Sequence, residues 1–471
     1  MTAHRLRPAF LAGAALVLCL AALGLFWPGV AMYDSVAQYG QVLSGEFTDW
    51  HPPIMARLWS VLHASLGGTS APMLVLQMAL YWVGLGLMAA ALAQARKTRC
   101  GIAVLAIGLM PLFLGWQGTV LKDAQMLGAM LAAVGVVGWW RLRGLRVPGW
   151  AWLIMAVLLG YATLVRANAV FATVALIVML VGPRNWWARG VVALVAVGVV
   201  LAVSPWINHG LLGASDSGVA QTEAIYDLSA IAVRAPGVPI GLSRAAVETI
   251  AARHCVKPYF WDPLGEPARC AAAVEPLHAY PTGTLYRMLA AAIVRAPGAY
   301  VAHRLAHWNS TERWFVGAGG PGALPPVTSE ANDLGLASPA PLVRLWQRLE
   351  QITVDTPLGW PIAFLSVAVV SLVAAVRRHA GAARDLALAL LVSAVLLEAS
   401  FVVLSIASDL RYHLWSMVAT TLAVVLLVAD QPPSRRDWLA GGVALMVITV
   451  SGTIARIVLP PAPASYAAQL L

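Results

Sequence analysis

Long apolar runs separated by short polar turns dominate the pattern of this chain. Each run is close to the 20 or so residues with which a helix crosses a bilayer, and the apolar residues occupy every face instead of alternating. This pattern is typical of membrane helices. It predicts an all-α polytopic membrane protein with eleven crossings, at residues 8–27, 71–95, 100–116, 124–140, 149–165, 168–183, 190–207, 358–376, 386–406, 413–429 and 438–458.

Two longer polar stretches interrupt the apolar runs, at residues 28–70 and 208–357. They divide the chain into an N-terminal membrane module with a first outer loop (1–207), an extracytoplasmic loop domain (208–357) and a C-terminal membrane module (358–471). In the first loop, an amphipathic segment after Pro53 predicts a juxtamembrane helix. In the large loop, the amphipathic residues 285–307 predict a single helix at the membrane interface.

Composition excludes a soluble globular protein, because 60% of residues are hydrophobic and only 11% are charged, against about a quarter in soluble domains. The net charge of +10 lies almost wholly at one set of turns, which hold 15 basic and three acidic residues. The positive-inside rule therefore puts the N-terminus in the cytoplasm and the C-terminus in the periplasm, as expected for a bacterial inner membrane protein. We expect the lipid bilayer, and no nucleic acid, as a partner. The basic residues are Arg5, Arg7, Arg96, Lys97, Arg99, Arg141, Arg143, Arg146, Arg184, Arg189, Arg377, Arg378, Arg384, Arg435 and Arg436.

Three basic residues stand on short outer turns, which usually lack them: Lys122, Arg166 and Arg411. Convergence of these cations predicts an anion such as a phosphate, because Lys and Arg form charge-assisted hydrogen bonds to its oxygens. The alternative is that Lys122 pairs with Asp123 and that Arg411 pairs with Asp409.

Asp34 follows the first predicted helix and suits a general base at the membrane surface. The alternative is an N-cap of a short helix running through Gln38. His51 lacks the ligand spacing of a zinc site, and although Asp34, Asp49 and Asp123 could share a Mg²⁺ ion, we expect neither a metal nor another cofactor.

Several of these motifs resemble the GT-C superfamily of integral-membrane glycosyltransferases, which includes protein O-mannosyltransferases and lipid A aminoarabinose transferases. The similar features are an acid after the first helix, a His-Pro-Pro corner with a juxtamembrane helix, and the order of the outer charged turns. The resemblance covers helices one to six and the last outer turn. The matching residues are Asp34, Trp50, His51, Pro52, Pro53, Lys122, Asp123, Leu164, Val165, Arg166, Ala167, Asn168, Asp409, Leu410, Arg411 and Tyr412.

The resemblance implies transfer of a sugar from a polyprenyl-phosphate donor to an extracytoplasmic acceptor, which would be a glycolipid, a polysaccharide or a protein. Asp34 would be the base, and Lys122, Arg166 and Arg411 would hold the donor phosphate. One departure is Ser35, where mannosyltransferase-like members carry Glu; it leaves the donor subfamily open. The residues expected around the substrate are His51, Asp49, Asp123, Asn168, Gln38 and Tyr412.

Two other functional classes remain open. A Wzy-like polymerase or O-antigen ligase also uses polyprenyl-linked sugars. A transporter or lipid flippase would place charges at mid-membrane, where only Glu398 lies well inside a predicted span. In the large loop, Cys255 and Cys270 predict a disulfide in an oxidising compartment, although two free thiols would give the same sequence.

Overall fold

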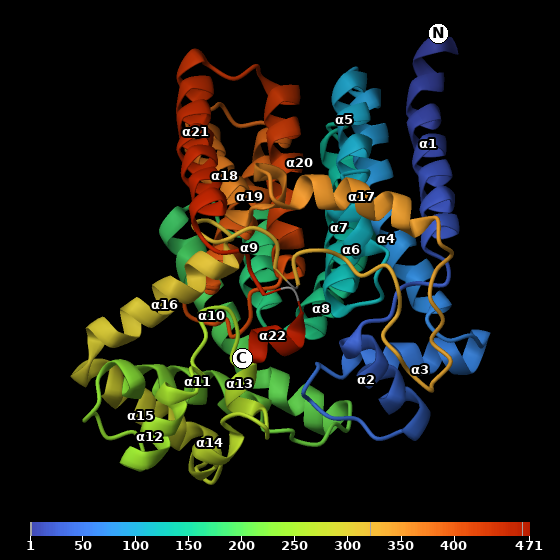
Figure 1. Cartoon of the computed structure of the whole chain (residues 1–471). Coiled ribbons are helices and arrows are strands. Elements are labelled where there is room, and N and C mark those ends of the chain that lie inside the picture. The colour runs from blue at the N-terminus through green and yellow to red at the C-terminus, as the bar shows by residue number, and fades with distance from the viewer. Residues whose placement is uncertain (1, 321, 464) are drawn as a thin grey trace.

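The protein is a bundle of α-helices with a smaller helical domain at one end (Figure 1). The computed structural model describes residues 2–320, 322–463 and 465–471, and in these residues it has helices and three isolated β-bridges but no strand. The side chains of residues 1–6 are not described, so the N-terminal Arg5 of the predicted topology lies outside the described part. The two termini lie at opposite ends of the bundle.

Helices coincide with every predicted crossing. The predicted span 100–116 is divided between two helices, α5 and α6. The helices of the bundle are α1 (Thr2–Phe26), α4 (Ala71–Gln94), α5 (Thr98–Gly108), α6 (Pro111–Gln117), α7 (Lys122–Arg141), α8 (Gly149–Val165), α9 (Ala169–Val181), α10 (Trp186–Pro205), α18 (Pro361–Val376), α19 (Ala382–Ser400), α20 (Leu414–Asp430) and α21 (Arg435–Val458).

Fewer helices meet the length and hydropathy of a membrane span than the sequence pattern predicts. Five of the described helices are long and apolar enough to span a membrane, or six when α5 and α6 count as one broken span. These two meet at 58° because Pro111 begins α6, and the residue before a proline disfavours helical geometry. The protein is thus an integral membrane protein, and eleven crossings stay a prediction.

Glycines bring α4 and α7 into close contact. A Cβ atom on Gly84 would lie 2.4 Å from the Leu131 backbone, and one on Gly135 would lie 2.6 Å from the Gly84 carbonyl oxygen. Small residues allow membrane helices to approach closely and gain van der Waals contact. This packing fixes the position of α7, whose first residues are Lys122 and Asp123.

The first outer loop folds into α2 (Tyr33–Ser44) and α3 (Ile54–Leu66). Gly45 ends α2 with a φ of 74°, a left-handed conformation that favours glycine. Pro53 is the N-cap of α3. Proline is tolerated at a helix start because the backbone N–H that it lacks would have no partner within the helix. A β-bridge between Val30 and Thr119 holds the start of this loop against the turn before α7.

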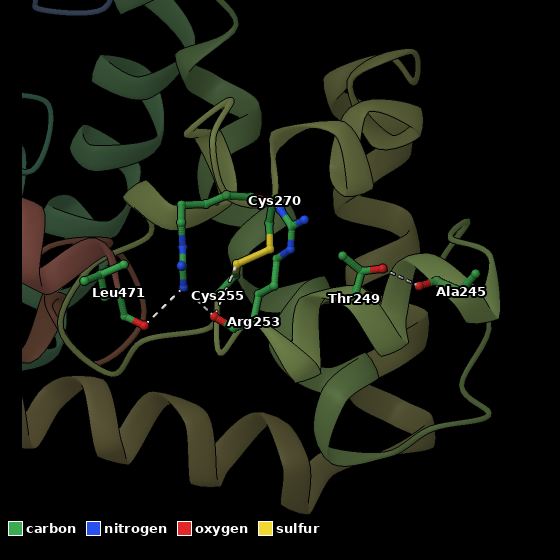
Figure 2. Close-up of a disulfide and its surroundings, with 7 residues drawn as sticks. Ala245, Thr249, Arg253, Cys255, Cys270 and Leu471 are labelled. Carbon is green, nitrogen blue, oxygen red and sulfur yellow. Dashed lines mark hydrogen bonds between the residues drawn. A yellow bond between two sulfur atoms is a disulfide. The ribbon is translucent and has the colours of Figure 1, made fainter.

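Part of the large loop has a hydrophobic core of its own, formed by buried residues between 224 and 292. A disulfide joins Cys255 to Cys270 in this domain (Figure 2). The single helix predicted over 285–307 is wrong, because the chain breaks before Pro297 into two helices. The domain's helices are α11 (Val219–Arg234), α12 (Arg244–Ala252), α13 (Asp262–Gly265), α14 (Ala271–His278), α15 (Thr282–Arg295) and α16 (Pro297–Thr311).

The remainder of the large loop returns to the membrane bundle. The Ala31 amide donates to Ser329 Oγ at 3.0 Å, next to the start of α2. Helix α17 (Val343–Val354) lies against α6, and Trp346 Nε1 donates to the Pro111 carbonyl at 3.0 Å. The short C-terminal helix α22 (Tyr466–Leu470) contacts the loop domain, since the Tyr466 hydroxyl donates to Asp262 Oδ2 at 2.9 Å.

Candidate functional site

Asp34 lies in the first turn of α2 and faces two cations from distant parts of the chain. Arg411 Nη1 donates to Asp34 Oδ2 at 3.0 Å, and Lys122 Nζ lies 3.5 Å from the same oxygen. The Asp34 side chain is 14% exposed. A carboxylate in this position is ionised and partly accessible, and the positive end of α2 adds to its stabilisation.

The alternative role of Asp34 as a helix N-cap is wrong. The N-cap of α2 is Met32, whose amide donates to Ser35 Oγ at 3.1 Å. Ser35 also donates to the Val120 carbonyl at 2.5 Å, which ties α2 to the turn that carries Lys122. The serine that departs from the mannosyltransferase pattern therefore fixes the distance between Asp34 and Lys122.

His51 completes the surroundings of Asp34. Lys122 Nζ donates to His51 Nδ1 at 2.8 Å, and His51 Nε2 lies 3.9 Å from Asp34 Oδ1. Burial, with the nearby Lys122 charge, lowers the pKa of His51 to about 3. His51 is therefore neutral at physiological pH, and its Nδ1 accepts a hydrogen bond from the Lys122 ammonium group.

Arg166 and Asp123 form a second ion pair beside that of Arg411 and Asp34. Arg166 Nη1 donates to Asp123 Oδ1, and Arg166 Nε donates to Asn168 Oδ1 at 2.9 Å. The guanidinium group of Arg166 also stacks 3.8 Å from the centre of the Tyr412 ring. Arg411 Nε is 3.8 Å from Asp123 Oδ2, so both pairs belong to one network.

The neighbour pairings considered from the sequence hold for one cation and fail for another. Arg411 Nη2 contacts Asp409 Oδ2 at 2.9 Å, as that alternative predicted. Lys122 instead contacts Asp34 and His51, because consecutive residues on a helix point in different directions. Three cations thus face three carboxylates, and the network as a whole is close to neutral.

A cavity of about 200 Å³ opens beside this network. Its charged lining groups are Lys122 and Arg166, and no carboxylate lines it in the described part of the chain. Arg411 is not among the residues that line the cavity. The cavity is lined by Trp50, Pro52, Lys122, Arg166, Ala167, Asn168, Phe401, Leu404, Ser405, Ile406, Ala407 and Tyr412.

The wall formed by residues 401–407 was missed by the sequence pattern, which predicted a span over 386–406. Helix α19 ends at Ser400, whose hydroxyl donates to the Leu397 carbonyl at 2.6 Å. Serine hydroxyls compete in this way with helix hydrogen bonds. The following segment carries no glycine or proline that would have signalled the helix end.

The loop domain supports this wall. Arg304 Nη1 donates to the Ser405 carbonyl at 2.7 Å, and the Trp261 amide donates to the Ile406 carbonyl at 2.9 Å. Arg304 is itself held by Asp227 and Glu223. The loop domain therefore helps to shape the cavity. Hydrophobic periodicity in the sequence does not reveal these hydrogen bonds between the loop domain and the wall.

Two predicted substrate residues lie elsewhere. Asp49 Oδ1 accepts hydrogen bonds from Ser217, from its amide at 2.7 Å and from its hydroxyl at 2.6 Å. Gln38 is buried, and its Nε2 donates to the Asp34 carbonyl oxygen at 3.3 Å within α2. Asp49 thus joins the first loop to the start of the large loop. Neither Asp49 nor Gln38 lines the cavity.

The charge of Asp34 follows from the balance of two opposing effects. Burial alone would raise its pKa, but the Arg411 and Lys122 charges outweigh burial, and the pKa lies well below its usual range.

The possible Mg²⁺ set of Asp34, Asp49 and Asp123 is not assembled. Within the described residues, the one group of three potential ligands that comes together is Glu312, Glu398 and His413.

Comparisons with known proteins find no matching family model and no matching curated protein. Two solved structures of membrane glycosyltransferases of the GT-C superfamily are similar. The first is the archaeal oligosaccharyltransferase AglB from Archaeoglobus fulgidus, in complex with an inhibitory peptide and a dolichol-phosphate, with TM-score 0.36 and 15% identity. This chain spans 55% of the length of AglB, and 95% of this chain is covered.

The second is ArnT from Cupriavidus metallidurans in the apo state, with TM-score 0.29 and 14% identity over 89% of this chain and 76% of that one.

Proposed function

We propose that this protein is a membrane glycosyltransferase that moves a sugar from a polyprenyl-phosphate donor to an extracytoplasmic acceptor. The observation that carries the proposal is the position of Asp34, 3.5 Å from Lys122, which lines a cavity whose charged lining groups are all cations. A carboxylate base and an anion site then lie side by side at one end of the membrane bundle.

Lys122 and Arg166 hold the donor phosphate, which leaves when the sugar is transferred. Their side chains line the cavity, and Asn168 and Tyr412 lie beside them. Arg411 acts through Asp34, because it contacts three carboxylates and does not line the cavity. This division differs from the expectation that all three cations contact the phosphate.

Asp34 accepts a proton from the acceptor hydroxyl as that oxygen attacks the anomeric carbon of the sugar. The bond from that carbon to the phosphate oxygen breaks, and the phosphate carries away the electron pair. Attack from the side opposite the phosphate inverts the anomeric centre. Because the phosphate neutralises Lys122 and Arg166, donor binding increases the basicity of Asp34 at the moment when a base is needed.

Comparative mass spectrometry tests this proposal. Surface glycolipids, polysaccharides and glycoproteins are compared between cells that carry the chain, cells that lack it, and cells that carry Asp34→Asn. We expect one class of molecule to lose the mass of one sugar in both deficient cells. Identical envelopes in all three cells would contradict the proposal, provided that immunoblotting shows equal amounts of membrane-inserted protein.

A polymerase or ligase would give a different result in the same experiment. Loss of the chain would then shorten a polymer by many units, or leave it unattached, instead of removing one sugar. A transporter would leave purified protein unable to consume a polyprenyl-phosphate sugar in detergent.

A further inference from the structure

Three potential metal ligands meet in the protein interior, outside the candidate active site. Glu312 follows α16, Glu398 lies two residues before the end of α19, and His413 precedes α20. One ligand atom from each lies within 4.8 Å of the other two. The three residues are 0%, 1% and 0% exposed, in that order.

Glu312, unlike Glu398, has no compensating partner among the described residues. Neither oxygen of Glu312 has a hydrogen-bond partner, and His413 Nε2 also has none. Within the described residues, no lysine or arginine forms an ion pair with Glu312 or Glu398. Burying a carboxylate without a partner is unfavourable by several kcal/mol, and most buried polar groups are therefore paired.

We infer that Glu312, Glu398 and His413 bind a divalent metal ion, and that Zn²⁺ is the ion that this donor set fits best. Two carboxylates balance the charge of a divalent cation when the imidazole is neutral. Imidazole nitrogen and carboxylate oxygen are both zinc ligands, and three protein ligands leave a fourth tetrahedral position open to water.

The geometry needs little adjustment to close around an ion. Ligand atoms bound to one zinc ion lie roughly 3.4 Å apart, so shifts of about an ångström suffice. His413 Nδ1 lies 2.6 Å from Glu398 Oε2, and the Ser416 hydroxyl donates to Glu398 Oε1. The Ser416 contact orients the Glu398 carboxylate, as groups around a metal site do for its ligands.

Such an ion would join three parts of the fold. Glu312 follows the last helix of the loop domain, while Glu398 and His413 flank the irregular segment that forms one cavity wall. The ring of His413 lies 4.7 Å from that of Phe401, which lines the cavity. The metal therefore has a structural role, and this inference does not depend on the proposed sugar chemistry.

Metal binding to the purified full-length protein tests the inference. The protein is stripped with a chelator, then titrated with Zn²⁺ alone, and bound zinc is measured by mass spectrometry after desalting. We expect one equivalent of zinc, together with a higher melting temperature that chelation reverses, because an ion that binds the folded state stabilises it.

Glu312→Gln and Glu398→Gln should weaken zinc binding at least tenfold and abolish the thermal shift. Glu350→Gln is the matched control, since Glu350 is also a buried glutamate but does not belong to the cluster. It should retain both the zinc equivalent and the thermal shift. Because Glu350→Gln retains the free thiols of Cys19 and Cys100, this control also accounts for any zinc that those thiols bind.

Absence of zinc uptake by the stripped wild-type protein would overturn the inference, and so would undiminished uptake by both cluster variants. If the variants do not fold, the wild-type result alone decides: an unchanged melting temperature on removal and return of Zn²⁺ would overturn it. None of these measurements uses a sugar donor, so they are independent of the proposed transferase activity.

Discussion

Arg411 donates a 3.0 Å hydrogen bond from Nη1 to Asp34 Oδ2 across 377 positions of sequence. This contact joins the first outer loop to the last outer turn and places a carboxylate beside Lys122. It also distinguishes Asp34 from an ordinary helix cap, because the carboxylate bonds to side chains from other helices.

Replacing Asp34 with Asn should lower turnover by about 10²–10⁴, the usual effect of losing a general base. Asn keeps the size of the side chain but cannot accept a proton at neutral pH. Turnover is measured with saturating polyprenyl-phosphate sugar, and Asp333→Asn is the control because Asp333 is exposed and outside the network. Near-normal turnover in Asp34→Asn would exclude it as the base and leave Asp123 and Asp409 as the remaining acids in this network.

Removing Lys122 should weaken donor binding by about 1.5–3 kcal/mol, the range for hydrogen bonds to charged groups. The fold should tolerate Lys122→Ala, because Arg411 still compensates Asp34. Donor affinity is measured by calorimetry on purified protein. Arg244→Ala is the control, since Arg244 is 92% exposed in a surface pair with Glu248. Unchanged affinity in Lys122→Ala would exclude a direct contact with the donor.

Removing Arg411 should act mainly on stability. Arg411→Ala leaves Asp34, Asp123 and Asp409 with fewer partners, and breaking a buried ion pair costs about 3–5 kcal/mol. The melting temperature should therefore fall much further in Arg411→Ala than in Lys122→Ala. Equal stability of the two variants would contradict the structural role assigned to Arg411.

Acid should destabilise the folded protein partly through His51. Its pKa is about 3 in the folded state and about 6.5 in the unfolded state, so the unfolded state takes up the proton first as pH falls. This contribution is about 2 kcal/mol at pH 5 and almost absent at pH 7.5. Denaturant unfolding at the two pH values, compared with His51→Gln, measures it. An equal pH dependence in both proteins would show that His51 is charged in the folded state.

Removing the disulfide between Cys255 and Cys270 should destabilise the loop domain by roughly 3 kcal/mol, as expected for closing a loop of about 15 residues. Alkylation of non-reduced protein, followed by mass spectrometry, checks the pairing. Cys19 and Cys100 should alkylate after denaturation, whereas Cys255 and Cys270 should not. Alkylation at either of the latter positions would exclude the bridge.

The orientation predicted from the basic turns places Arg244 in the periplasm. A cysteine at position 244, in a chain without Cys19 and Cys100, should react with an impermeant reagent in intact spheroplasts. A cysteine in place of Arg435, at a predicted inner turn, should react only after lysis. The reverse pattern would invert the topology.

The sequence by itself determined the helices of the bundle. Backbone groups in lipid have no water to bond, so apolar runs of membrane length must form helices whatever their neighbours are. The proline signal likewise placed the start of α3 after Pro53. The end of α19 at Ser400 escaped prediction, because only local serine hydrogen bonds mark it.

Only the tertiary structure decided which charged groups meet. Sequence order could not show that Asp34 contacts Lys122 and Arg411, or that Asp49 turns away to Ser217, because these contacts depend on the packing of helices far apart in the chain. The cluster of Glu312, Glu398 and His413 has the same origin. Side-chain charges interact over a few ångströms, and helix packing alone brings such distant residues within that range.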